Sequence, residues 1–500
     1  MKNIIKYTAM SVLTLFAVGC GDEFLEKEPS QFLTSDQFTD AAALNPEVIA
    51  GTMTGIYALM FETGTGGLGN HVDFGQKAYD IELDMLSGNM ALSVNTYGWY
   101  RDVTQLTLMN DFTSTFLHYK PWRYYYRIIR SANMVIDGLG GNEAIPELDD
   151  NKYIMGQAKT MRAHSYFYLT QLFTYEYDAA QEILPIYTNS IDPNPPKSPA
   201  SDVFELIVND LEEAIDLMDG YVRPSKTQVD ANIAKVILAY ALAFRAQGND
   251  LQRAKDLTNE VINTAGYPLT TAEQLAFPGA GSGFNNVNTP SWMWGMDLTS
   301  DQGLNLVSWW GQIDYYTYSY AAFGDVKAID RALYDQIPAD DIRKTQFNPG
   351  AGNFALIPYN KFFDPARIAG NQRFILTDYL YMRIDEVYLL NAEVAARSGD
   401  EGTARTRLKE LLTARIPDVS YIDGLSGNGL AQEIYLQNRI ELWGEGKTYL
   451  AMKRNKYDMV RGSNWLFSPN ITLPYNDPRL TYSIPQNEIQ NNPFITEGNK

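Results

Sequence analysis

The sequence predicts a mainly α-helical protein, in which stacked helical hairpins carry long, loop-rich insertions and a few short strands. Three observations predict this class. Apolar residues recur at three- and four-residue spacing in several long segments, glycines end many of these segments, and stretches rich in Gly, Asn, Tyr and Trp separate them. Spacing of three and four residues aligns apolar side chains along one face of a helix, so these segments can pack in pairs.

The first predicted hairpin joins residues 124–139 to residues 152–173. Ile128, Ala132 and Val135 share one face of the first segment, and a glycine-rich stretch ends it. Further helices are predicted at residues 201–218, where Ser201 and Asp202 are plausible caps, and at 232–246, 252–262, 381–412 (as a second hairpin) and 431–453.

The hairpin at residues 381–412 has the spacing of a known repeat. A turn is expected at Gly399, with Ala392 seven residues before it and Ala404 five residues after it. This arrangement resembles the tetratricopeptide repeat, in which small residues let two helices approach closely. Gly248 and Ala254 give a looser instance of the same pattern.

Two insertions, at residues 64–105 and 278–326, interrupt the helical pattern, and the chain ends in a segment rich in Pro and Asn. Loops of this length within a compact protein are usually functional or disordered. The aromatic content of the insertions disfavours disorder, so we expect them to carry the binding function.

The first 19 residues predict a signal peptide. Lys2 and Lys6 precede a short apolar run from about Ala9 to Val18, and Gly19 and Cys20 follow it. The run is too short to span a bilayer, and a cysteine at this position resembles the bacterial lipobox, so we expect cleavage before Cys20 and lipidation of that residue. The acidic residues that follow resemble surface-export signals. The mature chain, residues 20–500, is therefore expected as one outward-facing, lipid-anchored domain.

Composition excludes several classes of function. The formal charge of −20 and the pI near 4.6 disfavour nucleic acid, because phosphate binding relies on clustered Lys and Arg. Cys20 is the only cysteine and the chain has three histidines without zinc-ligand spacing, so neither metal nor cofactor is predicted. The longest apolar run after Cys20 covers residues 231–244 and contains Lys235, which leaves the lipid as the expected membrane anchor.

Six strings distributed along the chain carry a family resemblance. They are Phe24–Pro29, Gln157–Phe173, Arg223–Lys226, Tyr381–Glu393, Gln437–Gly446 and Tyr482–Pro493. In this order they resemble the motifs of the SusD/RagB family of outer-membrane nutrient-binding lipoproteins. Asn438, where many relatives have Glu, and Thr174–Tyr177, where relatives have Gly and Asp, depart from the family pattern.

The resemblance implies binding rather than catalysis. A member of this family would capture oligosaccharide or polysaccharide at the cell surface. It would then deliver the ligand to a SusC-like TonB-dependent barrel in the outer membrane, as part of glycan uptake in polysaccharide utilisation. The alternative is a surface binding protein that holds peptides or another non-glycan nutrient on the helical-repeat scaffold.

Sugars present apolar faces bounded by hydroxyls, so exposed aromatic rings beside hydrogen-bonding groups are expected to hold them. Relatives place ligand-binding aromatics in the two insertions. The candidate ligand-binding residues are Asp73, Tyr97, Trp99, Arg101, Trp309, Trp310, Tyr315 and Tyr316. Trp292 and Trp294 alternate as in a strand and are expected in the core.

The sequence favours neither a glycosidase nor a nucleotide-binding protein. Glycosidases need a carboxylate pair, but Glu393, Glu441 and Glu445 fall in predicted helices and are expected to pair with Arg383, Arg439 or Lys447. The stretch Gly64–Gly69 spells GxGxxG, but it follows a helix-like segment rather than a strand, so no nucleotide site is predicted.

Overall fold

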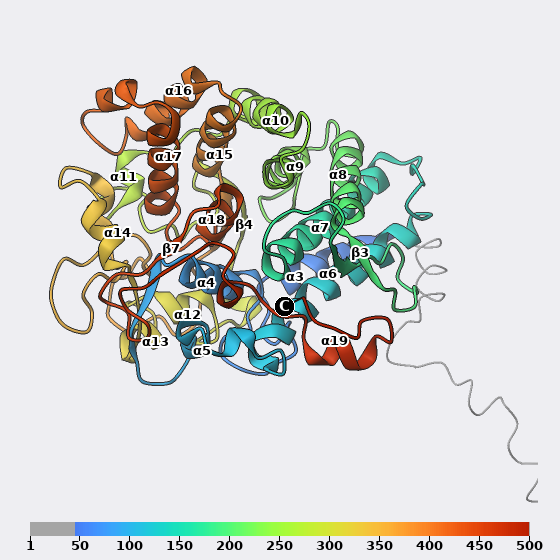
Figure 1. The fold of residues 1–500 in the computed structure, drawn as a ribbon, viewed down its shortest axis with the longest axis horizontal. Helices are drawn as coiled ribbons and strands as arrows, with labels where there is room; N and C mark the ends of the chain where they lie inside the picture. Colours follow the sequence, from blue (N-terminus) through green and yellow to red (C-terminus); the bar gives the residue numbers. More distant parts are fainter. Residues whose placement is uncertain (1–45, 500) are drawn as a thin grey trace, which may run out of the picture.

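The computed structural model describes residues 46–499, and Cys20, the signal peptide and the Phe24–Pro29 string lie outside them (Figure 1). Its longer helices are α3 (Pro46–Leu59), α4 (Gln76–Leu86), α6 (Lys120–Gly138), α7 (Asp149–Phe173), α8 (Ala200–Leu217), α9 (Ala231–Arg245), α10 (Asp250–Thr264), α15 (Ile384–Arg397), α16 (Glu401–Leu412), α17 (Gly427–Glu441) and α18 (Thr448–Asn455). The shorter ones are α5 (Arg101–Gln105), α11 (Ala272–Leu275), α12 (Trp309–Ile313), α13 (Tyr320–Phe323), α14 (Arg331–Gln336) and α19 (Gln486–Asn491). The strands are β1 (Met90–Asn95), β2 (Glu182–Pro185), β3 (Lys197–Pro199), β4 (Trp292–Met296), β5 (Asp325–Ile329), β6 (Tyr379–Arg383), β7 (Met459–Val460) and β8 (Thr472–Leu473).

The mainly helical class predicted from the sequence is confirmed. Helices α6, α7, α8, α9, α10, α15 and α16 pack each against the next, and α17 also lies against α15 (Figure 1). The series continues from α10 to α15 although more than a hundred residues separate these helices in the sequence. The helical hairpins therefore form one stack, and the intervening chain forms the rest of the molecule.

The predicted repeat geometry is confirmed at α15 and α16. Ala392 and Ala404 are fully buried where the two helices meet, in a small apolar core shared with α17. Gly399 ends the first helix with a φ of 85°, which residues with a Cβ rarely adopt. Small side chains at the crossing and a left-handed turn after the first helix together allow the close antiparallel pair.

Some predicted helix boundaries are wrong. The segment 431–453 is two helices, because α17 ends at Glu441 and the chain then turns through Gly444 and Gly446 at φ values of 83° and 74°. A Cβ on Gly446 would lie 2.7 Å from atoms of Asp80, so the turn also requires a close approach. The start of the segment 381–412 is strand β6, and α8 begins at Ala200, so Ser201 and Asp202 are not its caps.

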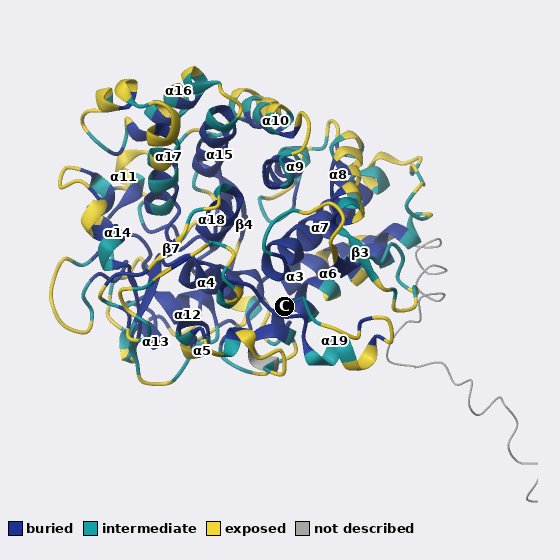
Figure 2. Ribbon diagram, viewed as in Figure 1, coloured by how far each residue is buried: buried dark blue, intermediate teal, exposed yellow. Residues whose placement is uncertain are grey.

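The two insertions predicted from the sequence contain short ordered elements and lie together. Strands β1 and β5 pair antiparallel, with Met90 opposite Ile329 and Asn95 opposite Asp325. Helix α4, in the first insertion, is buried along its whole length, as the dark ribbon in Figure 2 shows. Trp292 and Trp294 are buried in β4, so the prediction that they pack in the core is confirmed.

A buried charge cluster joins β6, α17 and the surrounding chain. It contains four cations and four carboxylates: Arg343, Lys361, Arg383, Arg415, Asp341, Asp385, Glu441 and Glu445. Arg383 donates to both Glu441 and Glu445 at 2.9 Å, which confirms one predicted partner. Lys447 instead pairs with Glu386 at 3.4 Å, Arg439 donates to Asn89, and Glu393 pairs with Arg454 and Arg397. The three carboxylates considered for catalysis are therefore buried and paired.

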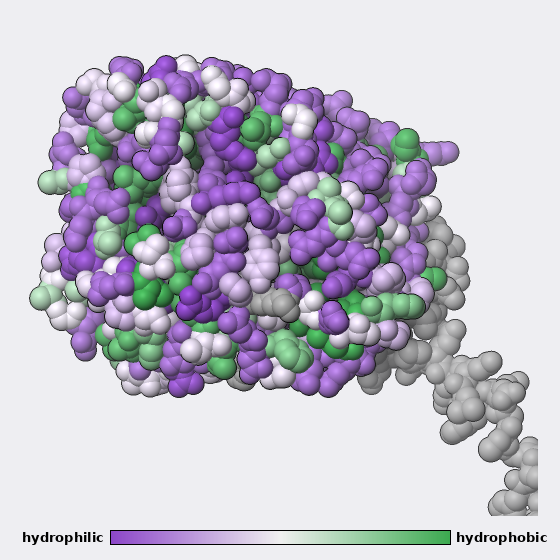
Figure 3. All heavy atoms as spheres, in the orientation of Figure 1, coloured by the Kyte–Doolittle hydropathy of each residue, from purple (hydrophilic) through white to green (hydrophobic). Residues whose placement is uncertain are grey.

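The surface matches the acidic, polar composition. Hydrophilic residues dominate the face drawn in Figure 3, and apolar residues gather there in small separate patches. Within residues 46–499, no helix combines the length and apolar character that crossing a membrane requires. The outer helices α10 and α16 expose one face and bury the other (Figure 2).

Candidate glycan-binding site

Four rings from three segments form a compact group, here called the aromatic cluster: His71, Tyr97, Trp99 and Tyr320. Trp99 stacks on His71 with ring centroids 4.9 Å apart and an angle of 16° between the planes. Tyr320 meets the edges of Tyr97 and Trp99 at 5.3 and 5.8 Å, and its hydroxyl contacts His71 Nδ1. Tyr97 is 54 % exposed and Trp99 is half-buried, so both present ring surface to solvent.

One buried carboxylate fixes the loop that carries these rings. Asp325, the first residue of β5, accepts hydrogen bonds from the backbone N–H groups of Thr96, Tyr97 and Trp99 at 2.7, 2.8 and 3.1 Å. Tyr100 then turns the chain at a φ of 60° into α5. The loop is held by charge-assisted hydrogen bonds across the two insertions, so the rings of Tyr97 and Trp99 are pre-positioned.

The loop borders an open cavity of about 330 Å³. Tyr97, Trp99, Arg101 and Asp102 line it, and the buried pair of Glu82 and Lys120 lies at its inner side. The exposed Arg101 contacts Asp102 through Nε at 3.3 Å, which leaves other guanidinium N–H groups of Arg101 available as donors. The volume falls within the range of small-molecule sites, and the lining combines ring faces with donors and acceptors, as sugar binding requires.

Trp309 and Trp310 are buried, although the sequence predicted that both would be exposed to a ligand. Both lie in the short helix α12 and are 3 % and 0 % exposed. Ser308 caps this helix by accepting from the N–H of Gly311 at 3.0 Å, which turns the two indoles into the interior. Trp309 meets Phe362 edge to face at 4.7 Å. Adjacent tryptophans can share one core here because they sit on a helix rather than in a loop.

Asp73 and Tyr316, two further candidates, are also buried. The Asp73 carboxylate is fully buried and accepts from the N–H groups of Gly66 and Leu68 at 2.8 and 3.0 Å, which closes the glycine-rich turn. Tyr316 is 8 % exposed, and its hydroxyl accepts from Arg367 at 2.6 Å. Tyr315 is half-buried against Tyr316 and Phe354. Of the eight candidates, Tyr97, Trp99 and Arg101 come together at the cavity.

The sequence did not single out His71, Tyr320, Asp325 or Phe323 as site residues. The first three complete or support the aromatic cluster, and Phe323 follows Tyr320 in α13 with half of its surface exposed. Burial raises the pKa of Tyr320, which therefore remains a neutral hydroxyl donor. The unusually dense run of tyrosines at residues 315–320 was the available signal, but it did not indicate which rings face solvent.

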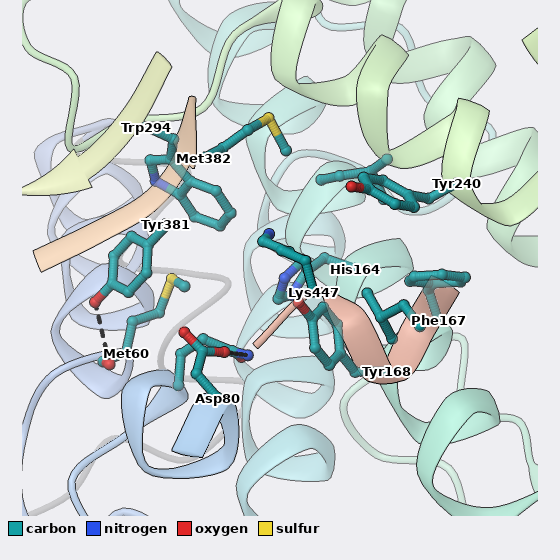
Figure 4. A pocket seen from close by; sticks show the side chains of 13 residues that line it. Met60, Asp80, His164, Phe167, Tyr168, Tyr240, Trp294, Tyr381, Met382 and Lys447 are labelled. Carbon is teal, nitrogen blue, oxygen red and sulfur yellow. Dashed lines mark hydrogen bonds between the residues drawn. The ribbon is translucent and has the colours of Figure 1, made fainter. Parts of the chain in front are cut away.

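A second cavity, between α4, α7 and α18, is structural. Its volume is about 20 Å³, too small for a sugar, and Asp80, His164 and Lys447 lie around it (Figure 4). Glu386 raises the pKa of Lys447, although burial opposes its charge. Burial and the nearby Lys447 ammonium lower the pKa of His164 to about 3.

The pKa of His164 predicts a loss of stability in mild acid. The folded protein keeps His164 neutral, whereas the unfolded chain binds a proton below the ordinary histidine pKa of about 6.5. Between pH 7 and pH 5 this linkage should cost about 2 kcal/mol of the free energy of unfolding. Urea unfolding of the wild type and of His164→Gln at both pH values measures the effect, because other titrating groups cancel in the difference. Identical pH dependence in the two proteins would contradict the assignment.

Two family models match the sequence. Residues 341–500 match the model of the SusD family, and residues 23–238 match a SusD-like model described as starch-binding and associating with the outer membrane. The chain belongs to the SusD family. The SusD motifs in α7, β6–α15, α17 and α19 thus occupy the scaffold that carries the aromatic cluster.

The curated SusD-like relatives match over part of their length. A SusD-like protein of Bacteroides ovatus is 26 % identical over 290 residues, 54 % of this chain and 46 % of the relative. The SusD-like protein P25 of Formosa agariphila is 24 % identical over 181 residues, 35 % of this chain and 30 % of the relative. The chain thus spans less than half of the curated relatives it matches.

Several solved structures share the fold over nearly their whole length. A SusD-like carbohydrate-binding protein of Bacteroides vulgatus has a TM-score of 0.70 and 24 % identity, with 89 % of this chain and 96 % of the other covered. The surface glycan-binding protein A of Bacteroides uniformis has a TM-score of 0.66 and 16 % identity, and the match covers 91 % of this chain and 99 % of the other. At these identities the likeness establishes the SusD fold.

Proposed function

We propose that this SusD-family protein is a lipid-anchored glycan-binding protein of the outer cell surface, and that it delivers oligosaccharides to a SusC-like TonB-dependent barrel. The observation that carries the proposal is the aromatic cluster beside an open cavity, where Trp99 and Tyr97 present ring surface next to Arg101. Cys20, directly after the predicted signal peptide, would carry the lipid.

The chemistry of the cavity suits a neutral or weakly polar ring compound. The face of Trp99 opposite His71 and the exposed ring of Tyr97 offer surfaces for the apolar faces of sugars. Arg101 and Asp102 offer a donor and an acceptor for hydroxyl groups at the rim. Because Asp325 fixes the loop backbone, little conformational entropy is lost when a ligand binds.

Replacing Trp99 by alanine tests the site. We expect the affinity for a bound oligosaccharide to fall at least tenfold, because the removal of a central aromatic contact commonly costs about 2 kcal/mol or more. Calorimetric titration of the purified protein with a panel of neutral oligosaccharides provides the measurement. Tyr421→Ala is the matched control, since Tyr421 is a comparably exposed ring on a distant segment, and its affinity should not change.

Three results would oppose the proposal. Trp99→Ala binding as tightly as the wild type would place the ligand elsewhere. Hydrolysis of a saccharide by the purified protein would make it an enzyme. Binding of peptides, with no binding of any saccharide in the panel, would favour the alternative of a non-glycan nutrient.

A further inference from the structure

A large groove beside the first half of α6 is separate from the aromatic cluster. Its volume is about 800 Å³, and α6, the segment 185–194 and α19 line it. The two hollows share α6, because its residue Lys120 lines the cavity of the aromatic cluster and its residue Arg123 lines the groove. A volume of this size accommodates several sugar rings or a comparable molecule.

Three arginines project into the groove from one face of α6. Arg123, Arg127 and Arg130 follow one another at spacings of four and three residues, which places their side chains in a row. Arg127 and Arg130 are exposed, and Arg123 donates one hydrogen bond to the Thr65 carbonyl at 3.3 Å. Within residues 46–499, no carboxylate oxygen lies within 4 Å of any of the three guanidinium groups.

The two carboxylates that line the groove, Asp192 and Glu488, already accept hydrogen bonds from neighbouring groups. Asp192 accepts from the N–H groups of Thr188 and Asn189 at 3.2 and 3.3 Å, and also from the Asn189 side chain. Glu488 accepts from Trp122 Nε1 at 3.2 Å and from Asn492 at 2.9 Å. These bonds hold both carboxylates to their own segments. Three guanidinium groups against two carboxylates leave the lining with a surplus of one positive charge, in a chain whose formal charge is −20.

Aromatic and amide groups complete the lining. The ring centroids of Trp122 and Tyr126 lie 4.8 Å apart. Tyr126 also packs edge to face with Tyr187, with ring centroids 5.7 Å apart, and both tyrosines are half-buried. Asn189 and Asn194 line the same groove. Rings, amides and unpaired guanidinium groups are the set that recognises a saccharide with acidic substituents, because guanidinium binds carboxylate and sulfate through paired hydrogen bonds.

We infer that the α6 groove is a second binding site, selective for saccharides that carry carboxylate or sulfate groups. This inference extends the proposed function by naming a substrate class for a hollow that the aromatic cluster does not form. An acidic polypeptide would meet the same arginines, but it would not need the ring faces of Tyr126 and Tyr187.

Calorimetric titration with trigalacturonate and with its fully methyl-esterified form tests the inference, since these two probes differ in charge. We expect the acid to bind and the ester to bind at least tenfold more weakly. In Arg127→Gln/Arg130→Gln the Kd of the acid should rise at least tenfold. The control Arg405→Gln/Arg407→Gln removes the same charge on α16, and its Kd should stay within about twofold of the wild type.

Further arms separate this site from the aromatic cluster. Trp99→Ala should bind trigalacturonate as the wild type does, and the Arg127/Arg130 variant should keep its affinity for neutral saccharides. If Trp99→Ala loses trigalacturonate binding and the Arg127/Arg130 variant keeps it, the groove assignment is overturned and the proposed function stands. Equal binding of acid and ester, or tighter binding of hexaglutamate than of trigalacturonate, would also overturn it.

Discussion

Replacing Glu441 by glutamine should lower the free energy of unfolding by about 3–5 kcal/mol, because it breaks the balance of the buried charge cluster. Glu441 receives hydrogen bonds from Arg343, Arg383 and Arg415 at 2.7–3.2 Å, and its side chain is fully buried. Although burial alone would raise it, the three guanidinium groups hold the pKa of Glu441 well below its ordinary value. The variant would leave four cations facing three carboxylates in the interior.

Urea unfolding at neutral pH measures this loss against a matched control. Glu410→Gln removes a carboxylate that pairs with Arg407 at 2.8 Å on the exposed side of α16. Such a pair contributes less than about 1 kcal/mol, so the control should unfold close to the wild type. An equal decrease in the free energy of unfolding in the two variants would mean that the buried contacts of Glu441 contribute no more stability than an exposed ion pair.

Replacing Trp310 by alanine should cost about 3–5 kcal/mol of stability, as expected when a large buried side chain leaves a cavity. Trp310 is completely buried, and it packs edge to face on Trp309 at 5.0 Å. Thermal and urea unfolding measure the loss, and Trp310→Phe should recover part of it because much of the apolar volume is restored.

The same variant distinguishes a structural role from a binding role. Under conditions where Trp310→Ala is folded, its affinity for a saccharide that needs Trp99 should stay within about threefold of the wild type. A stable Trp310→Ala protein that no longer binds would instead show that α12 opens and presents its indoles to the ligand.

The helical scaffold was predictable because its signals are local. The three- and four-residue spacing in α6 and α7, and the small residues at Ala392 and Ala404, need only neighbouring residues to be recognised. The last three residues of strand β6, Tyr381–Arg383, were predicted as helix because the five residues of the strand are all apolar or bulky and all buried, which gives no alternating pattern.

The site was less predictable because exposure depends on distant segments. Trp99 and Trp309 both lie in aromatic-rich insertions, but Phe362 covers Trp309, whereas the loop of Trp99 is held at the surface by Asp325. Asp73 likewise binds its own turn through contacts that spacing does not reveal. Local composition therefore indicated the region of the proposed site, but it did not separate the rings that face solvent from the rings that support them.

The hydrogen bonds from the loop 96–99 to Asp325 connect two parts of the gene that lie far apart. An exchange of one insertion between relatives, without the other, would keep the helical stack folded but release the backbone that carries Tyr97 and Trp99. New ligand preferences should therefore arise by changes at ring positions within this fixed frame. Replacing the whole loop 96–99 should preserve the positions of these rings only when strand β5, which contains Asp325, is exchanged together with it.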